Sequence, residues 1–151
     1  MVDTPKLVTQ QQINDIITKL FISEAQIKRP DTIIGVLNGA KTITNTLGAL
    51  LNVKTCFVKI STYRKESHSG EININIPKHT RRSIEQSKSL WIVDDIYDTG
   101  LTMKMIDSLI FVLNEHVEVK RFTLFSKQET TFIKFGELTA DWIAFPWEQT
   151  R

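Results

Sequence analysis

The sequence has a single cysteine, no long hydrophobic run and almost no net charge, and each of these features excludes a class of protein. Cys56 is the only cysteine among 151 residues, so an intramolecular disulfide is impossible and a reducing compartment is indicated. No apolar stretch approaches the roughly 20 residues that span a bilayer. The first residues also lack the apolar core of a signal peptide. We therefore expect a cytoplasmic protein without a membrane span, and a buried, inert Cys56.

The charge balance limits the partners. The 19 Lys and Arg residues exceed the 17 Asp and Glu residues by +2, whereas proteins that bind nucleic acid usually concentrate a larger basic excess. We expect no nucleic-acid partner, and any anion site must be local. A length of 151 residues, 41% of them hydrophobic, fits a single domain over residues 1–151.

Apolar periodicity predicts two successive strand–helix–strand units. They follow an amphipathic helix that begins after Thr9, which has capping-box spacing with Gln12. Alternating strands and helices of this kind predict an α/β fold with a doubly wound, mainly parallel sheet. The expected segments are residues 32–37, 42–51 and 55–63 for the first unit and 90–95, 101–114 and 117–125 for the second.

Residues 64–88, between the two units, form the least core-like stretch. Isoleucines at 72, 74 and 76 alternate with asparagines, which is compatible with a hairpin arm, although a long mobile loop fits equally well. We interpret its basic residues as a solvated surface without a catalytic role, and the three histidines of the chain as surface residues. These residues are Arg64, Lys65, Lys78, Arg81 and Arg82, and His68, His79 and His116.

Two adjacent acids, Asp94 and Asp95, stand where the apolar strand from Trp91 leaves the sheet. The carboxyl edge of an open α/β sheet is where such folds bind ligands. Because successive side chains of a strand point to opposite faces, one carboxylate can face a ligand or metal while the other meets a structural partner.

The next turn, from Asp98 to Thr102, precedes the predicted helix. Free amides and the helix dipole favour a phosphate there, and Gly100 permits close approach of the backbone. An isolated Asp-Thr-Gly most often only caps a helix. The acid pair directly upstream makes an anion site the better interpretation.

An apolar strand, two acids, two further residues and Asp-Thr-Gly-x-Thr together resemble the phosphoribosyl pyrophosphate (PRPP) signature of type I phosphoribosyltransferases. The resemblance implies that Asp94 and Asp95 hold the ribose hydroxyls and the Mg²⁺-bound substrate. It also implies that Asp98 takes up a proton from the base, because an acid at that position is typical of enzymes for 6-oxopurines. The implied 5-phosphate cradle consists of Thr99, Gly100, Leu101 and Thr102.

Four further segments resemble the small xanthine-guanine and hypoxanthine phosphoribosyltransferases, and together they span most of the chain. They imply a pyrophosphate loop, a flexible hood arm over residues 64–88 that closes over the reaction, and a base-recognition segment over residues 126–151. Lys127 would read the 6-oxo group, while Trp142 would stack on the base and Ile143 would contact it through the backbone. We expect Trp147 in the core. The pyrophosphate loop holds Asn38 and Gly39, and the arm opens at Thr62 and Tyr63.

Two positions depart from that pattern. Asn38 stands where the xanthine-guanine enzymes have an arginine, so Lys41 or the basic arm would have to supply the charge. Ala144 replaces an acid that helps to place the 2-position of the purine. Hypoxanthine is therefore favoured over guanine and xanthine. The resemblance further implies a homo-oligomer, either a dimer or a tetramer.

Other functions remain as alternatives. Residues 35–42 miss the P-loop pattern of nucleotide triphosphatases at Ala40, where a glycine is needed. The acids Asp95 and Asp98 lie one position too far apart for a haloacid-dehalogenase-type phosphatase. Some regulators with the phosphoribosyltransferase fold bind RNA and keep the PRPP motif. We expect an enzyme of purine salvage that transfers phosphoribose from PRPP to hypoxanthine, guanine or xanthine and uses Mg²⁺.

Overall fold

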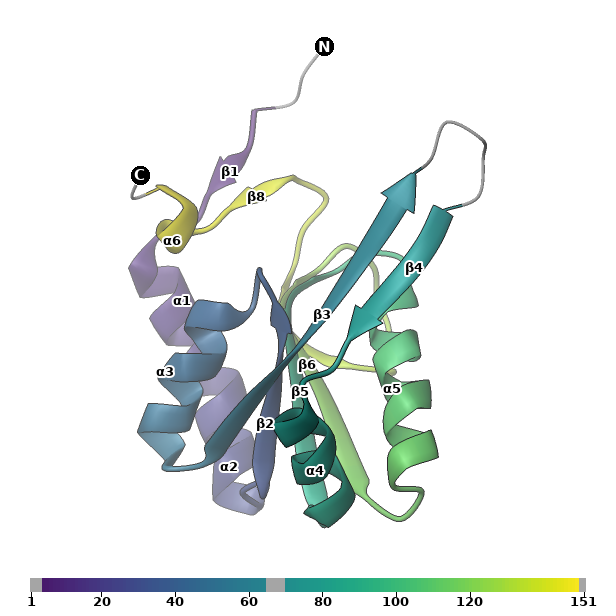
Figure 1. The fold of residues 1–151 in the computed structure, drawn as a ribbon. Coiled ribbons are helices and arrows are strands. Elements are labelled where there is room, and N and C mark those ends of the chain that lie inside the picture. Colours follow the sequence, from purple (N-terminus) through teal and green to yellow (C-terminus); the bar gives the residue numbers. More distant parts are fainter. Residues whose placement is uncertain (1–3, 65–69, 150–151) are drawn as a thin grey trace.

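A computed structural model describes residues 4–64 and 70–149, and its centre is a six-stranded sheet (Figure 1). The strand order is β4-β3-β2-β5-β6-β7, in which only β3 and β4 pair antiparallel. The predicted doubly wound, mainly parallel α/β fold is therefore confirmed. The elements of the two predicted units are β2 (Thr32–Leu37), α3 (Lys41–Leu51) and β3 (Lys54–Arg64), then β5 (Ser89–Tyr97), α5 (Leu101–Leu113) and β6 (Glu118–Ser126).

Helices cover both faces of the sheet because the central strands are apolar on both sides (Figure 1). On one face, Phe21, Trp91 and Phe122 pack against one another, with Trp91 and Phe122 ring centroids 4.7 Å apart. On the other face, Ile106 and Ile110 of α5 are buried in a second apolar cluster. Cys56 is buried, as expected.

The N-terminal helix forms as predicted and begins with a capping box. The amide of Gln12 donates to Thr9 Oγ1 at 3.1 Å, and the amide of Thr9 donates to Gln12 Oε1 at 2.9 Å. Three helical segments then follow without a break. They are α1 (Gln10–Ile16), the π-helical η1 (Ile17–Ile22) and α2 (Ser23–Ile27).

The described part of residues 64–88 contains a hairpin strand and a helix, of which the sequence indicated only the hairpin, as one of two alternatives. The hairpin arm exists, because β3 pairs antiparallel with β4 (Gly70–Asn75), whereas Lys65 and His68 lie outside the described residues. The prediction of hairpin or loop was wrong for α4 (Lys78–Gln86), a helix packed on the sheet. Its buried side chains include hydroxyls, and Thr80 Oγ1 donates to the carbonyl of Phe57 at 2.9 Å. Hydroxyls give no apolar periodicity, so the helix left no signal.

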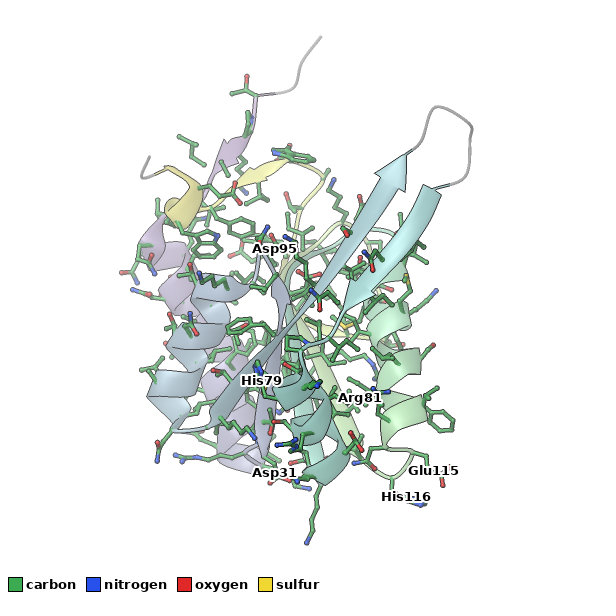
Figure 2. All side chains as sticks on the ribbon, in the orientation of Figure 1. Asp31, His79, Arg81, Asp95, Glu115 and His116 are labelled. Atoms are coloured by element: carbon green, nitrogen blue, oxygen red, sulfur yellow. The ribbon has the colours of Figure 1, made fainter. Side chains whose placement is uncertain are left out.

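The exposed face of α4 agrees with the sequence, since His79 and Arg81 lie at the surface (Figure 2). Arg82 is exposed as well. His116, in the turn after α5, is also exposed. Among the described residues, no helix is long and apolar enough to cross a membrane. Four short elements were not predicted from the sequence. The unpredicted elements are β1 (Lys6–Leu7), β7 (Lys134–Leu138), β8 (Ile143–Ala144) and α6 (Pro146–Gln149).

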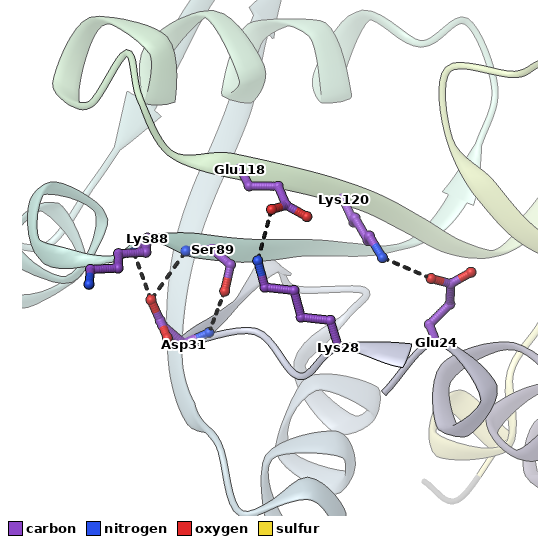
Figure 3. A network of polar contacts seen from close by, with 7 residues as sticks. All are labelled: Glu24, Lys28, Asp31, Lys88, Ser89, Glu118 and Lys120. Atoms are coloured by element: carbon purple, nitrogen blue, oxygen red, sulfur yellow. Dashed lines mark hydrogen bonds and ion pairs between the residues drawn. The ribbon is translucent and has the colours of Figure 1, made fainter. Parts of the chain in front are cut away.

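A polar network fastens α2 and the start of β2 to the amino-terminal ends of β5 and β6 (Figure 3). Buried Glu24 pairs with Lys120, at 3.2 Å, and with Lys134. Asp31 accepts the amides of Lys88 and Ser89 at 2.7 and 3.2 Å. These contacts lie at the end of the sheet opposite the candidate site, so we assign them to stability.

Candidate active site

The acid pair lies near the end of β5, and its two carboxylates have different surroundings. Asp94 lines a cavity of about 80 Å³ and accepts the amide of Asp95 at 2.8 Å. Asp95 accepts the amide of Ile96 at 2.8 Å and abuts the β2–α3 turn, where a Cβ on Gly39 would stand 2.5 Å from Asp95 Cγ. The strand continues to Tyr97, two residues further than predicted, and the alternation of its side chains separates the two acids.

Burial raises the pKa of the Asp94 carboxyl well above its ordinary value, and repulsion from the Asp95 carboxylate raises it further. A cation beside two adjacent carboxylates would offset the repulsion between their charges. The described residues contain no group of three or more His, Cys, Asp or Glu side chains that could hold a metal. Mg²⁺ is commonly held by one or two carboxylates together with waters and the phosphate oxygens of a substrate, and the acid pair could supply the carboxylates.

The same cavity opens onto the turn between β5 and α5. Gly100 has a φ of +85°, and a Cβ there would stand 2.8 Å from Tyr97 Cζ, so only glycine fits this turn. Thr99 Oγ1 accepts the amide of Leu101 at 3.3 Å, and α5 starts at Leu101. The start of a 13-residue helix thus faces a cavity next to a carboxylate, an arrangement suited to a phosphate with a bound cation. The residues that line it are Asp94, Ile96, Tyr97, Asp98, Thr99, Gly100, Leu101, Thr102, Met103 and Thr123.

Three predicted base-site residues from separate parts of the chain lie together. Lys127 Nζ is 3.7 Å from Asp98 Oδ2 and 5.6 Å from the centroid of the Trp142 ring. The main chain of Lys127 is fixed as well, because its amide donates to the carbonyl of Tyr97 at 2.8 Å. Trp142 is 65% exposed, so it is not a core residue. Trp147, in contrast, is partly buried and stacks on Phe145 at 4.7 Å, as expected.

The remaining predicted residues lie on two other segments. Asn38, in the turn after β2, and Lys41, at the start of α3, are both exposed, and the Leu37–Asn38 peptide is cis. Thr62 and Tyr63 belong to the β3 arm, in register with Ile72 and Glu71 of β4. Ile143 is buried, with 3% of the residue exposed, and lies in β8 in register with Lys6 of β1.

Several residues at the site were not predicted from the sequence: Ile96, Tyr97, Met103 and Thr123 line the cavity, and Gln128 contacts Asp98. Tyr97 lies beneath Gly100, Thr123 of β6 lines the cavity, and the Gln128 side chain donates to the carbonyl of Asp98. Tyr97 stood inside the recognised motif and could have been found there. Thr123 and Gln128 reach the site only because β6 pairs with β5.

A mainly parallel sheet with an acid pair near its carboxyl end and a helix that starts at the adjacent cavity is typical of α/β proteins that bind phosphate esters. The chain belongs to the phosphoribosyltransferase family, since residues 5–149 match the family model for the phosphoribosyl transferase domain.

Its relatives include enzymes of purine metabolism. The hypoxanthine-guanine phosphoribosyltransferase of Aquifex aeolicus (strain VF5) is 30% identical over 146 residues, which cover 84% of this chain and 79% of the relative. The crystal structure of a purine phosphoribosyltransferase from Pyrococcus horikoshii Ot3 superposes with a TM-score of 0.82 at 27% identity, over 97% and 96% of the two chains. A Helicobacter pylori xanthine-guanine-hypoxanthine phosphoribosyltransferase has the same fold, with a TM-score of 0.77 at 18% identity over 97% and 95%. The chain is therefore similar to purine phosphoribosyltransferases.

Proposed function

We propose that this protein transfers phosphoribose from PRPP to a 6-oxopurine and releases the nucleoside monophosphate and pyrophosphate. The observation that carries the proposal is the cluster of Asp98, Lys127 and Trp142 beside the cavity at the β5–α5 turn. An acid, a cation and an exposed aromatic ring are the groups that an oxopurine requires, for its proton, its carbonyl and its ring face. The relative from Aquifex aeolicus, whose name includes both hypoxanthine and guanine, supports the same substrate class.

PRPP would bind along the carboxyl end of β5. The free amides at the start of α5 would take the 5-phosphate, together with the hydroxyls of Thr99 and Thr102 and the close backbone of Gly100 and Leu101. Asp94 and Asp95 would take the ribose hydroxyls and the Mg²⁺ bound to the substrate. A cation there would relieve the repulsion between the two acids, which, after burial, contributes to the raised pKa of Asp94. When bound, Mg²⁺ would neutralise the charge of the departing pyrophosphate.

The base would lie between the turn and the C-terminal segment. Asp98, 64% exposed at the cavity, would accept the proton that the purine nitrogen releases as it bonds to the ribose. General base catalysis of this kind contributes on the order of 10²–10⁴ in rate. Lys127 would donate a hydrogen bond to the 6-oxo group. The Trp142 ring would stack on the base, and the backbone of Ile143 would form a hydrogen bond with the edge of the base. Residues 126–151 would thus be the base-recognition segment.

Among the 6-oxopurines, we propose hypoxanthine as the preferred substrate. Ala144, which is half-buried, has no polar atom in its side chain to meet a 2-oxo or 2-amino group. A buried polar substituent without a partner costs about 1–3 kcal/mol, so guanine and xanthine would bind less tightly.

The other end of PRPP would meet the β2–α3 turn. Asn38 and Gly39 would contact pyrophosphate, with Lys41 as the nearest cation along the chain. Thr62 and Tyr63, with the arm over residues 64–88, would close over the bound substrates and exclude water. We also propose that the protein is cytoplasmic and forms a homo-oligomer, a dimer or a tetramer, which light scattering would measure.

The test is an activity panel with PRPP, Mg²⁺ and each of hypoxanthine, guanine, xanthine, adenine, orotate and uracil. We expect nucleotide from the 6-oxopurines, with the highest kcat/KM for hypoxanthine. Product from none of the purines would contradict the proposal. In that case, specific RNA binding by the purified chain would favour the regulatory alternative, and ATP or GTP hydrolysis would favour the nucleotide triphosphatase.

A further inference from the structure

The two-stranded sheet of β1 and β8 joins the N-terminal residues to the segment that carries Trp142 (Figure 1). The strands are parallel, with Lys6 opposite Ile143 and Leu7 opposite Ala144. The amide of Lys6 donates to the carbonyl of Trp142 at 2.7 Å, and the amide of Val8 donates to the carbonyl of Ala144 at 3.1 Å. Main-chain bonds from β1 therefore reach the residue whose ring lies beside Lys127.

Packing holds the residues around Trp142 more firmly than it holds Trp142 itself. Val8, Ile143 and Phe145 are 1%, 3% and 1% exposed and belong to the apolar core. Trp142 is 65% exposed, and Lys127 Nζ lies 5.6 Å from the centroid of its ring. A ring in this position is directed mainly by its own backbone, because packing on its faces constrains it little. The bond from Lys6 acts directly on that backbone.

We propose that the backbone amide of Lys6 is a positioning group of the base site. By holding the carbonyl of Trp142, it orients the aromatic ring toward Lys127 and Asp98, and the N-terminal strand thus contributes to base binding without touching the base. This inference rests on the proposed function, since Trp142 is taken to stack on the base. It predicts that loss of a single N–H group on β1 weakens base binding and leaves PRPP binding intact.

Proline substitution removes one amide at a time, which makes a matched set of variants possible. Lys6→Pro deletes the N–H that donates to Trp142, and Lys6 already has the extended backbone of a strand. Lys6→Ala changes the same side chain but keeps the amide. Leu7→Pro places a proline in the same strand at an amide that points away from β8, because successive amides of a strand alternate in direction.

In steady-state kinetics, Lys6→Pro is expected to raise the KM for hypoxanthine by roughly two- to tenfold, the effect of one neutral hydrogen bond. The KM for PRPP and the kcat at saturating base should stay within about twofold of the unsubstituted protein, within the spread usual for remote sites. Lys6→Ala, which keeps the amide, should have the KM for hypoxanthine of the unsubstituted protein. Leu7→Pro should not raise the KM for hypoxanthine. An unchanged KM for hypoxanthine in Lys6→Pro, equal increases for both substrates, or the same defect in Leu7→Pro would each overturn the proposal.

A second measurement separates this proposal from the proposed function. The indole N–H resonance of Trp142, assigned by its loss in Trp142→Phe, reports on the ring in the absence of any substrate. We expect this resonance to shift or broaden in Lys6→Pro and to keep its position in Lys6→Ala and Leu7→Pro. If it is unchanged in Lys6→Pro, the positioning role is refuted, whatever the enzyme does. If it moves while no purine is converted by the unsubstituted protein, the proposed function fails and the structural link between Lys6 and Trp142 stands.

Discussion

Replacing Gly39 by alanine tests whether the close contact between the β2–α3 turn and Asp95 matters for PRPP binding. The new Cβ would stand 2.5 Å from Asp95 Cγ, whereas carbon atoms in contact prefer about 3.5–4.0 Å. The carboxylate would therefore have to move by about 1 Å, which also strains its hydrogen bond to the amide of Ile96, now 2.8 Å long. Gly39 does not have a positive φ, so alanine introduces the clash without backbone strain.

The expected result is a KM for PRPP raised by about 10- to 100-fold, because a displacement of 1 Å in a binding group can cost that much. The KM for hypoxanthine should change by less than about threefold, since the base cluster lies apart from this turn. Steady-state kinetics with each substrate varied in turn measures both values. Thermal unfolding of the same variant checks that the domain remains folded.

A double-mutant cycle with Asp95→Ala shows whether the contact with Asp95 causes the weaker PRPP binding of Gly39→Ala. Asp95→Ala alone should weaken PRPP binding, but adding Gly39→Ala should then have little further effect, because the carboxylate that the new methyl group meets is gone. If Gly39→Ala weakens PRPP binding equally with and without Asp95, the contact is irrelevant and the reasoning is refuted.

Three further predictions address the base site and the stability of the fold. Asp98→Asn should lower kcat by on the order of 10²–10⁴ while the KM for PRPP stays within a few-fold, because only the proton acceptor is lost. Trp142→Ala should raise the KM for the base by roughly 5- to 100-fold, as expected for the loss of a stacking contact of about 1–3 kcal/mol. Glu24→Gln should lower the free energy of unfolding at pH 7 by about 1–3 kcal/mol, because Lys120 and Lys134 lose their anionic partner.

The pH dependence of the Glu24 effect follows from its surroundings. Burial raises the pKa of Glu24, but its hydrogen bonds and ion pairs with Lys134 and Lys120 outweigh burial and lower it below the ordinary 4.5. A depressed pKa contributes stability above the unfolded-state value, and this contribution is lost as the pH falls through the folded-state pKa. Denaturant unfolding should therefore show the defect of Glu24→Gln at pH 7 and a smaller defect below about pH 4.

Each of these predictions has an outcome that contradicts it. Equal losses in kcat and in PRPP binding for Asp98→Asn would remove the proton-transfer role. An unchanged KM for the base in Trp142→Ala would exclude stacking. Trp142→Phe is the control, because phenylalanine keeps an aromatic ring and an unchanged KM there would agree with stacking. A defect of constant size for Glu24→Gln from pH 7 to pH 3 would show that packing, and not charge, makes Glu24 stabilising.

The sequence by itself determined the features that depend on neighbouring residues. The strand that carries Asp94 and Asp95 is followed directly by the turn from Asp98 to Thr102, so periodicity and turn chemistry were enough to predict a ligand site at a sheet edge. The capping box at Thr9 was equally local. Such patterns also sufficed for the central strands β2 and β5, because parallel strands buried on both faces must be apolar.

Only the tertiary structure decided which distant residues meet. Pairing of β5 with β6 brings Lys127 to Asp98, and the return of the chain through β8 brings Trp142 to Lys127, contacts that no periodicity encodes. The helix α4 was missed because hydroxyls satisfied by backbone carbonyls look polar in a sequence and are buried in the fold. The bond from Lys6 to Trp142 is decided in the same way, because strand partners depend on the path of the whole chain.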